Sequence, residues 1–187
     1  MLKRLFLALV LVWIGFVNSC GTTRITVPTT RRELRNPNVL CHKQIKVSID
    51  PRFTTRERVL IFDALAIIKR LGITSRIVSS NADINIRLWS HGCGDLVVGL
   101  YTFGNDYVQI DRHCSRSENQ FKIIVAHELG HWLGMEHVCD LDGRTSDICS
   151  GIGSGVGIMN PYISPDHHDE ITPLDVLEFK RVCPRLI

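Results

Sequence analysis

The chain has 187 residues, 22 basic and 19 acidic side chains, a formal net charge of +3 and seven cysteines. This length is enough for one domain with a well-filled core, but not for two ordinary domains. No run of basic residues is interleaved with aromatic residues, so the composition argues against nucleic acid as a partner.

The first 20 residues have the layout of a secretory signal. Lys3 and Arg4 precede an apolar run over residues 5–17, which is short for a membrane span. The segment Val17-Asn18-Ser19-Cys20 resembles a bacterial lipobox, in which the cysteine is lipidated. We predict a lipoprotein-type signal peptide and an exported protein anchored to a membrane through Cys20, the outer membrane in a diderm bacterium. Secretion as a soluble protein is the alternative.

Residues 21–40 are rich in Thr, Arg, Pro and Asn, a composition that predicts a flexible tether. Residues 41–187 then form the folded domain. Alternation of apolar and polar side chains predicts strands within this domain. The predicted strands are residues 45–49, 76–78, 84–88, 97–103 and 107–111, and the last two are joined by a turn at Gly104-Asn105.

Three helices are predicted from their start signals. Thr54 and Glu57 form a capping box for a first helix that stops near Gly72. Its predicted buried stripe is Val59, Leu60, Ile67, Ile68 and Leu71. The second helix starts at Ser117 with Gln120, runs to about Leu133 and buries Phe121, Ile124 and Val125. The third starts at Thr172, Pro173 and Asp175 and ends before Pro184.

The second helix carries a metal-binding pattern made by His127, Glu128, His131, Gly134 and His137. Positions 127 and 131 lie one helical turn apart, so both imidazoles can reach one ion. Gly134 can adopt a positive φ, end the helix and return the chain so that His137 reaches the same ion. The pattern predicts a catalytic Zn²⁺ held by three histidines, with Glu128 as the base that takes a proton from water. Histidines on a buried helix face are the alternative.

Residues 127–137 resemble the metzincin metallopeptidases, whose signature His-Glu-x-x-His-x-x-Gly-x-x-His is matched at every fixed position. Metzincins also carry a methionine turn, and Met159 in Gly157-Ile158-Met159-Asn160-Pro161 is the candidate. Residues 157–182 match more loosely and are most similar to matrixins and their prokaryotic relatives.

The resemblance implies an α+β fold of the zincin type. The upper half would hold a mixed twisted sheet and two long helices, and the loop-rich lower half the methionine turn and a C-terminal helix. Strand 107–111 would be the edge strand above the cleft, where an extended peptide can pair through its backbone. The implied function is that of a zinc endopeptidase acting on proteins or peptides, and we expect a monomer. The alternative is a non-catalytic surface lipoprotein that uses the scaffold for binding or adhesion.

The cysteines are accounted for if Cys20 carries lipid and the other six form three disulfides. Sequence alone leaves several pairings open. We favour Cys41 with Cys183, Cys93 with Cys114, and Cys139 with Cys149. The alternative for Cys41 is a thiolate bound to zinc in a latent enzyme.

A second zinc or a calcium ion has weaker support. His91, Asp95, Asp111 and His113 lie close together in sequence, and matrixin-like folds hold structural ions in the comparable region, but the spacing does not match. Residues 140–143 contain two aspartates and a glycine but lack the regular spacing and the glutamate of a calcium loop. Surface or turn roles are the alternative for all of these residues.

Overall fold

The computed structural model describes residues 43–90, 99–102, 104–138, 157–160, 163 and 171–184. The described elements are β1 Gln44–Ile49, α2 Thr55–Lys69, β2 Thr74–Ile77, β3 Ile84–Trp89, β4 Gly99–Tyr101, β5 Tyr107–Asp111, α3 Glu118–Trp132 and α5 Pro173–Val182. Each strand and helix predicted from the sequence is present. The division at residues 20 and 40 stays a prediction, because both positions lie outside the described residues.

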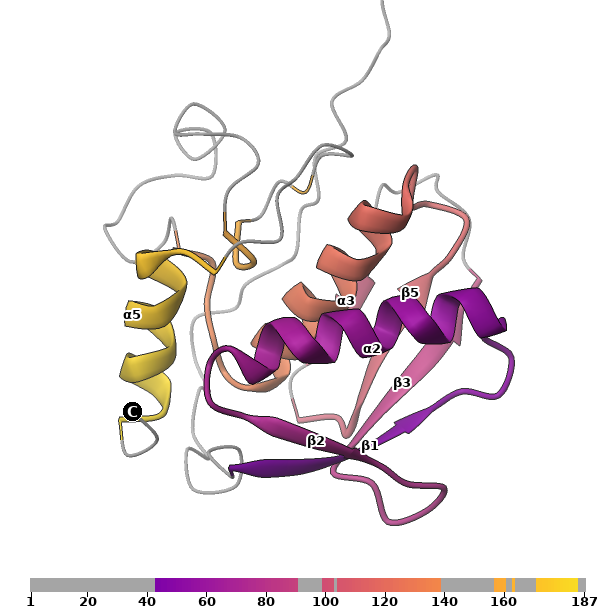
Figure 1. The fold of residues 1–187 in the computed structure, drawn as a ribbon, viewed down its shortest axis with the longest axis horizontal. Helices are drawn as coiled ribbons and strands as arrows, with labels where there is room; N and C mark the ends of the chain where they lie inside the picture. Colours follow the sequence, from indigo (N-terminus) through magenta and orange to yellow (C-terminus); the bar gives the residue numbers. More distant parts are fainter. Residues whose placement is uncertain are drawn as a thin grey trace, which may run out of the picture.

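The five strands form one mixed sheet in the order β2-β1-β3-β5-β4 (Figure 1). Strand β1 is parallel to β2 and β3, and β3 is parallel to β5. Parallel β1 and β2 need a crossover, which α2 provides. Strand β4 is antiparallel to β5. The chain turns between them at Gly104, whose φ is +82°, and the Asn105 N–H donates to the Thr102 carbonyl at 3.1 Å.

The edge strand next to β5 is β4, so the prediction that residues 107–111 form the edge is wrong. Val108 of β5 is opposite Ile86 of β3 on one side and opposite Tyr101 of β4 on the other. After β3, the chain therefore forms the edge strand β4 first and then turns back to form β5 between β4 and β3. The apolar alternation of both strands is the same whichever of them lies outside, so it could not decide the order.

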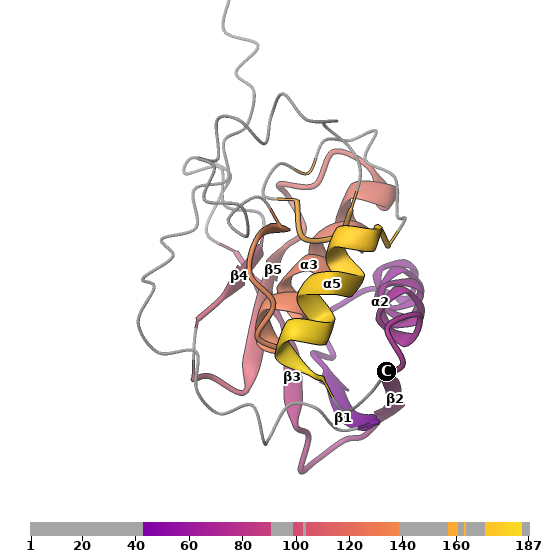
Figure 2. The same ribbon diagram turned by 90° about the vertical axis from the view of Figure 1, so that its left-hand side faces the viewer.

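Helices α2 and α3 pack against each other on one face of the sheet (Figures 1 and 2). Alternate strand residues line this face and are fully buried, namely Val47, Ile84, Ile86, Val108 and Ile110. The Phe53 and Phe121 rings meet edge to face with their centroids 6.3 Å apart, which joins the N-terminal ends of the two helices. Among the described residues, no helix has the length and apolar character that a membrane span requires.

Helix α2 begins as predicted, but its buried stripe differs at one position. The Thr54 N–H donates to Glu57 Oε2 at 2.6 Å, and the Glu57 N–H donates to Thr54 Oγ1 at 3.3 Å. The prediction that Val59 is buried is wrong, because its side chain is 43% exposed. The other predicted residues of the stripe are buried, and the buried residues of the helix are Leu60, Ile61, Ala64, Leu65, Ile67 and Ile68.

Helix α5 lies to one side of the α2–α3 pair (Figures 1 and 2). Its start is the predicted one, with Pro173 in the first turn and a capping box made by Thr172 and Asp175. The helix packs against the turn that ends α3, since a Cβ at Gly134 would lie 3.1 Å from Val182 Cγ1. This contact places α5 next to the segment that leads to His137.

Candidate metal centre

Helix α3 presents two histidines from successive turns, and the turn after it brings a third. The His127 and His131 Nε2 atoms are 3.0 Å apart. Helix α3 ends at Trp132 with Leu133 as its C-cap, and Gly134 adopts a φ of +87°, a conformation that costs glycine little. The chain therefore turns back, and His137 Nε2 lies 3.2 Å from His131 Nε2 and 3.3 Å from His127 Nε2. The three predicted ligands meet at one point.

Backbone carbonyls orient two of these rings. The His127 Nδ1 atom lies 2.7 Å from the Ile158 carbonyl oxygen, and the His131 Nδ1 atom lies 2.9 Å from that of Met135. A carbonyl oxygen only accepts, so Nδ1 must carry the proton in each ring and the Nε2 lone pair faces the other histidines. Burial also favours neutral rings. Burial lowers the pKa of His131, and the Glu178 charge acts in the opposite direction. Burial and the nearby His131 together lower the pKa of His137 to about 3.

The three imidazoles fit a zinc ion. Tetrahedral zinc with nitrogen ligands at about 2.0–2.1 Å separates those nitrogens by about 3.3 Å, and the Nε2 atoms here are 3.0 to 3.3 Å apart. Three converging lone pairs repel one another unless a cation lies between them. Among the described residues, these histidines form the only group of three or more metal-binding side chains arranged to hold an ion.

Met159 packs against the helix turn that carries the first two ligands. A Cβ at Gly130, between His127 and His131, would lie only 2.3 Å from Met159 Sδ, so glycine lets the methionine approach the helix. The Met159 carbonyl accepts from the Val138 N–H at 3.3 Å. Residues 158 and 159 thus contact both the ligand helix and the residue after His137, and the assignment of Met159 to a methionine turn stays a prediction.

A buried aspartate on α5 holds this turn. Asp175 Oδ1 accepts from the Met159 N–H at 3.0 Å, and Oδ2 accepts from the Ile158 N–H at 3.2 Å. Oδ2 also accepts from the Thr172 N–H and hydroxyl at 2.8 and 2.7 Å. The sequence identified Asp175 only as a capping residue, because nothing local indicates that its carboxylate also binds a turn 16 residues away.

The Glu128 carboxylate lies against β4. Its side chain is 3% exposed, and the Tyr101 backbone N–H donates to it. A Cβ at Gly99 would lie 2.7 Å from Glu128 Cγ and from Glu128 Oε1, so β4 reaches this close only because residue 99 is glycine. Burial raises the pKa of Glu128 to about 8, and the hydrogen bond from Tyr101 acts in the opposite direction. A cation at the histidines would also lower this pKa.

We expect Gly99→Ala to lower the rate of peptide hydrolysis by about 10- to 100-fold, because a displacement of about 1 Å in a reacting group can have an effect of that size. The added methyl would push the Glu128 carboxylate and the Ile124 side chain, 2.8 Å away, from their positions. The histidines do not contact Gly99 in this way, so the zinc content should stay at the wild-type level. A folded, zinc-loaded Gly99→Ala protein with the wild-type rate would show that β4 does not position Glu128.

Several predicted residues lie outside the described part of the chain. These are Cys20, Cys41, His91, Cys93, Asp95, Cys139, the aspartates at 140 and 142, and Cys149. Cys114 and Cys183 lie within the described residues, and the three proposed disulfide pairings stay predictions. His113 is exposed, and its N–H donates to the buried Asp111 carboxylate at 2.9 Å. This contact is typical of a turn, and the second metal ion also stays a prediction.

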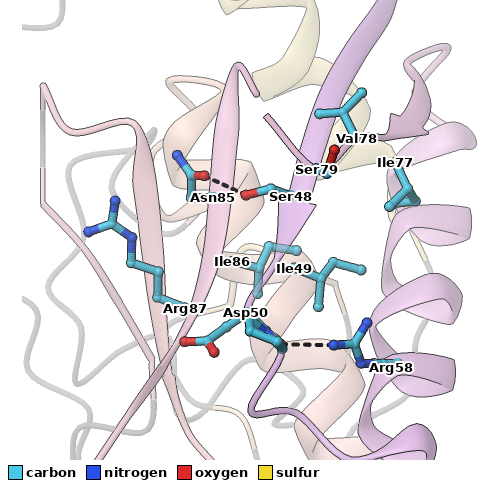
Figure 3. Close-up of a pocket in the computed structure, with 11 residues that line it drawn as sticks. Ser48, Ile49, Asp50, Arg58, Ile77, Val78, Ser79, Asn85, Ile86 and Arg87 are labelled. Carbon is cyan, nitrogen blue, oxygen red and sulfur yellow. Dashed lines mark hydrogen bonds between the residues drawn. The ribbon is translucent and has the colours of Figure 1, made fainter. Parts of the chain in front are cut away.

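A hollow of about 690 Å³ shares no lining residue with the histidine cluster. It lies where β1 and β2 end, and Figure 3 shows the hydrogen bonds that join Ser48 to Asn85 and Arg58 to Asp50 along its wall. Arg58 donates to the carbonyls of Asp50 and Phe53 at 3.3 and 3.1 Å, and Ser48 is hydrogen-bonded to Asn85. Arg58, Ser48 and Asn85 therefore stabilise strand ends here, and we assign the hollow no ligand.

Three histidines converging from a helix and its following turn, with a buried glutamate on the same helix, define a metallopeptidase-type centre. The family model described as Metallo-peptidase family M12 matches residues 69–170, which include every residue of this centre. The chain belongs to metallo-peptidase family M12. The finer likeness to matrixins stays a prediction.

Two solved structures of myroilysin are similar to the chain. The first shares 16% identity, covers 76% of this chain and 93% of its own, and has a TM-score of 0.47. The second shares 15% identity, covers 76% of this chain and 84% of its own, and also has a TM-score of 0.47. No curated protein matches the chain in sequence.

Proposed function

We propose that this M12 metallopeptidase is a zinc-dependent endopeptidase of the metzincin type. The observation that supports it most is the convergence of the His127, His131 and His137 Nε2 atoms within 3.0 to 3.3 Å, beside a buried carboxylate on the same helix. Three neutral imidazoles are a usual donor set for catalytic zinc, which keeps a further position open.

The proposed chemistry is hydrolysis of a peptide bond with Glu128 as the general base. Zinc at the three histidines would supply a Lewis acid that polarises the peptide carbonyl and acidifies water. Glu128 takes the proton of the attacking water and delivers it to the leaving amine. Its contacts with Gly99 and Tyr101 hold the carboxylate in one place, which favours both transfers.

The proposed substrate is an extended segment of a protein or peptide. Strand β4 pairs with β5 on one side, and on the other side it pairs with no strand of the described part. Such an edge can bind an extended chain through backbone hydrogen bonds. Because the Tyr101 N–H of β4 reaches Glu128, a peptide bound along this edge would pass beside the base. We propose that residues 160–165 wall the pocket for the side chain after the cleaved bond. Among them, the Ile163 carbonyl is fixed by Gln120 of α3 at 2.9 Å.

The function is tested by incubating the full-length protein with a mixed peptide library and mapping the products by mass spectrometry. We expect cleavage inside the peptides, its loss with a chelator and its return when zinc is added. A protein that binds zinc stoichiometrically but cleaves nothing would favour the alternative, a non-catalytic surface lipoprotein that uses the scaffold for binding. The intact Glu128 argues for the enzyme.

We also propose that the protein is exported and anchored to a membrane through a lipidated Cys20, with residues 21–40 as tether. The support is the charged and apolar layout of residues 1–17 and the lipobox-like residues that end at Cys20. A soluble secreted protein is the alternative.

We expect the protein made with its own signal to partition with membranes, and Cys20→Ser to release it or block its processing, because serine cannot form the thioether to lipid. Fractionation and metabolic labelling with a fatty acid measure both effects. Cys41→Ser serves as the matched cysteine control and should remain in the membrane fraction. An unlabelled wild-type protein in the soluble fraction would exclude the anchor.

A further inference from the structure

We propose that Glu178 of α5 is a positioning residue that fixes the segment carrying the third metal ligand and so sets how tightly the site holds zinc. The inference deepens the proposed function and rests on it. Its basis is a set of contacts among Glu178, Arg181 and residues 135–137, described below.

Glu178 is fully buried, which is unusual for a carboxylate. Its Oε1 atom accepts from the Glu136 N–H at 2.7 Å. Glu136 immediately precedes His137, so this hydrogen bond fixes the peptide unit next to the third ligand. A charged acceptor makes the bond stronger than one between neutral groups.

Arg181 holds the Glu178 carboxylate in the orientation that this bond needs. Arg181 Nε donates to Oε2 at 2.7 Å, and Nη2 donates to Oε1 at 2.6 Å. Arg181 Nη2 also lies 3.9 Å from Glu136 Oε1. The two-pronged contact compensates for the burial of the charge and restricts its rotation. Glu178 is therefore a rigid support on the helix.

The supported segment serves two ligands. The Met135 N–H donates to the Gly130 carbonyl at 2.9 Å, and the Met135 carbonyl lies 2.9 Å from His131 Nδ1. Residues 135–137 thus orient His131 at one end and supply His137 at the other, with Glu178 bound between them. Groups that orient metal ligands typically change metal affinity by about 10- to 100-fold when removed.

Helix α5 has two separate attachments to the centre. Asp175 binds the turn at Ile158 and Met159, and Glu178 binds the segment before His137. Leu177 lies between them on the helix but is 58% exposed. Leu177→Ala is therefore the matched control for Glu178→Ala. It also introduces an alanine into α5, but it leaves both attachments intact.

The test compares Glu178→Ala, Glu178→Gln and Leu177→Ala with the wild type, all as full-length protein. The dissociation constant for zinc is measured by competition with a chromophoric chelator. Thermal unfolding is measured without zinc and at a fixed zinc concentration. A ligand that binds only the folded protein raises its melting temperature by an amount that depends on this dissociation constant.

We expect Glu178→Ala to weaken zinc binding by about 10- to 100-fold and to reduce the zinc-induced rise in melting temperature. Glu178→Gln should lie between Ala and the wild type, because its amide keeps one oxygen that can accept from Glu136. Leu177→Ala should match the wild type in both measurements. If Glu178→Ala does not fold, the Gln variant decides.

Folded Glu178 variants with the wild-type zinc dissociation constant would overturn the inference. The inference would also be overturned if the variants melted at a lower temperature without zinc but showed the wild-type rise in melting temperature when zinc is added. That pattern would mean that Glu178 has a purely structural role. Failure of the wild type to bind zinc would instead refute the proposed function. The two failures are therefore distinguishable.

Discussion

Glu128→Gln should retain the fold and the bound zinc but lose peptide hydrolysis by about 100-fold or more, the usual effect of removing a general base. Glutamine has nearly the same shape and can still accept the Tyr101 N–H through its amide oxygen. It cannot take a proton from water. Steady-state cleavage of a fluorogenic peptide, together with the zinc content of the same sample, measures both properties.

The Glu128→Gln variant also controls for a contaminating peptidase, because it is purified in the same way as the wild type. Glu136→Gln is the matched comparison, since it changes a glutamate of the same motif segment whose carboxylate lies 3.9 Å from Arg181 Nη2 and whose bond to Glu178 uses the backbone N–H. We expect it to keep most of the activity. Unchanged hydrolysis in Glu128→Gln would show that another group moves the proton.

His137→Ala should weaken zinc binding by more than about 100-fold. Loss of a residue that only orients a ligand costs about 10- to 100-fold, and this variant removes a ligand and leaves two histidines. The buried His137 ring also fills space beside His127, with the ring centroids 5.2 Å apart, so the variant should be less stable. Metal analysis after dialysis against a weak chelator measures the loss.

His113→Ala is the control for His137→Ala. His113 is exposed, and its hydrogen bond to Asp111 uses the backbone N–H, which alanine keeps. We expect the wild-type zinc content and activity in this variant. If His137→Ala still bound one zinc per chain with unaltered affinity, the third ligand would be a different side chain.

Much of the site could be predicted because its parts are close in sequence. His127 and His131 share a face through helical periodicity, and Gly134 is followed by His137 within a few residues. The helix starts at Thr54, Ser117 and Thr172 were also predictable, because each cap is a hydrogen bond between residues three apart.

Features that depend on distant contacts could not be predicted. Both β4 and β5 alternate in the same way, so the edge position of β4 follows only from the pairing. Gly99 has no motif around it, yet it borders the Glu128 carboxylate across the fold. Glu178 reads as an ordinary charged helix residue, and its role depends on a bond to a residue 42 positions earlier. Val59 is apolar and precedes the buried Leu60, but successive helix positions point about 100° apart, and Val59 is exposed.

X-ray absorption at the zinc edge of the purified wild-type protein tests the central claim most directly. We predict one zinc per chain with three imidazole ligands and one further light ligand, all at about 2.0–2.1 Å. Sulfur at about 2.3 Å would place a thiolate such as Cys41 at the metal, as in a latent enzyme. Absence of bound zinc, or fewer than three imidazoles, would contradict the assignment of His127, His131 and His137 as the metal centre.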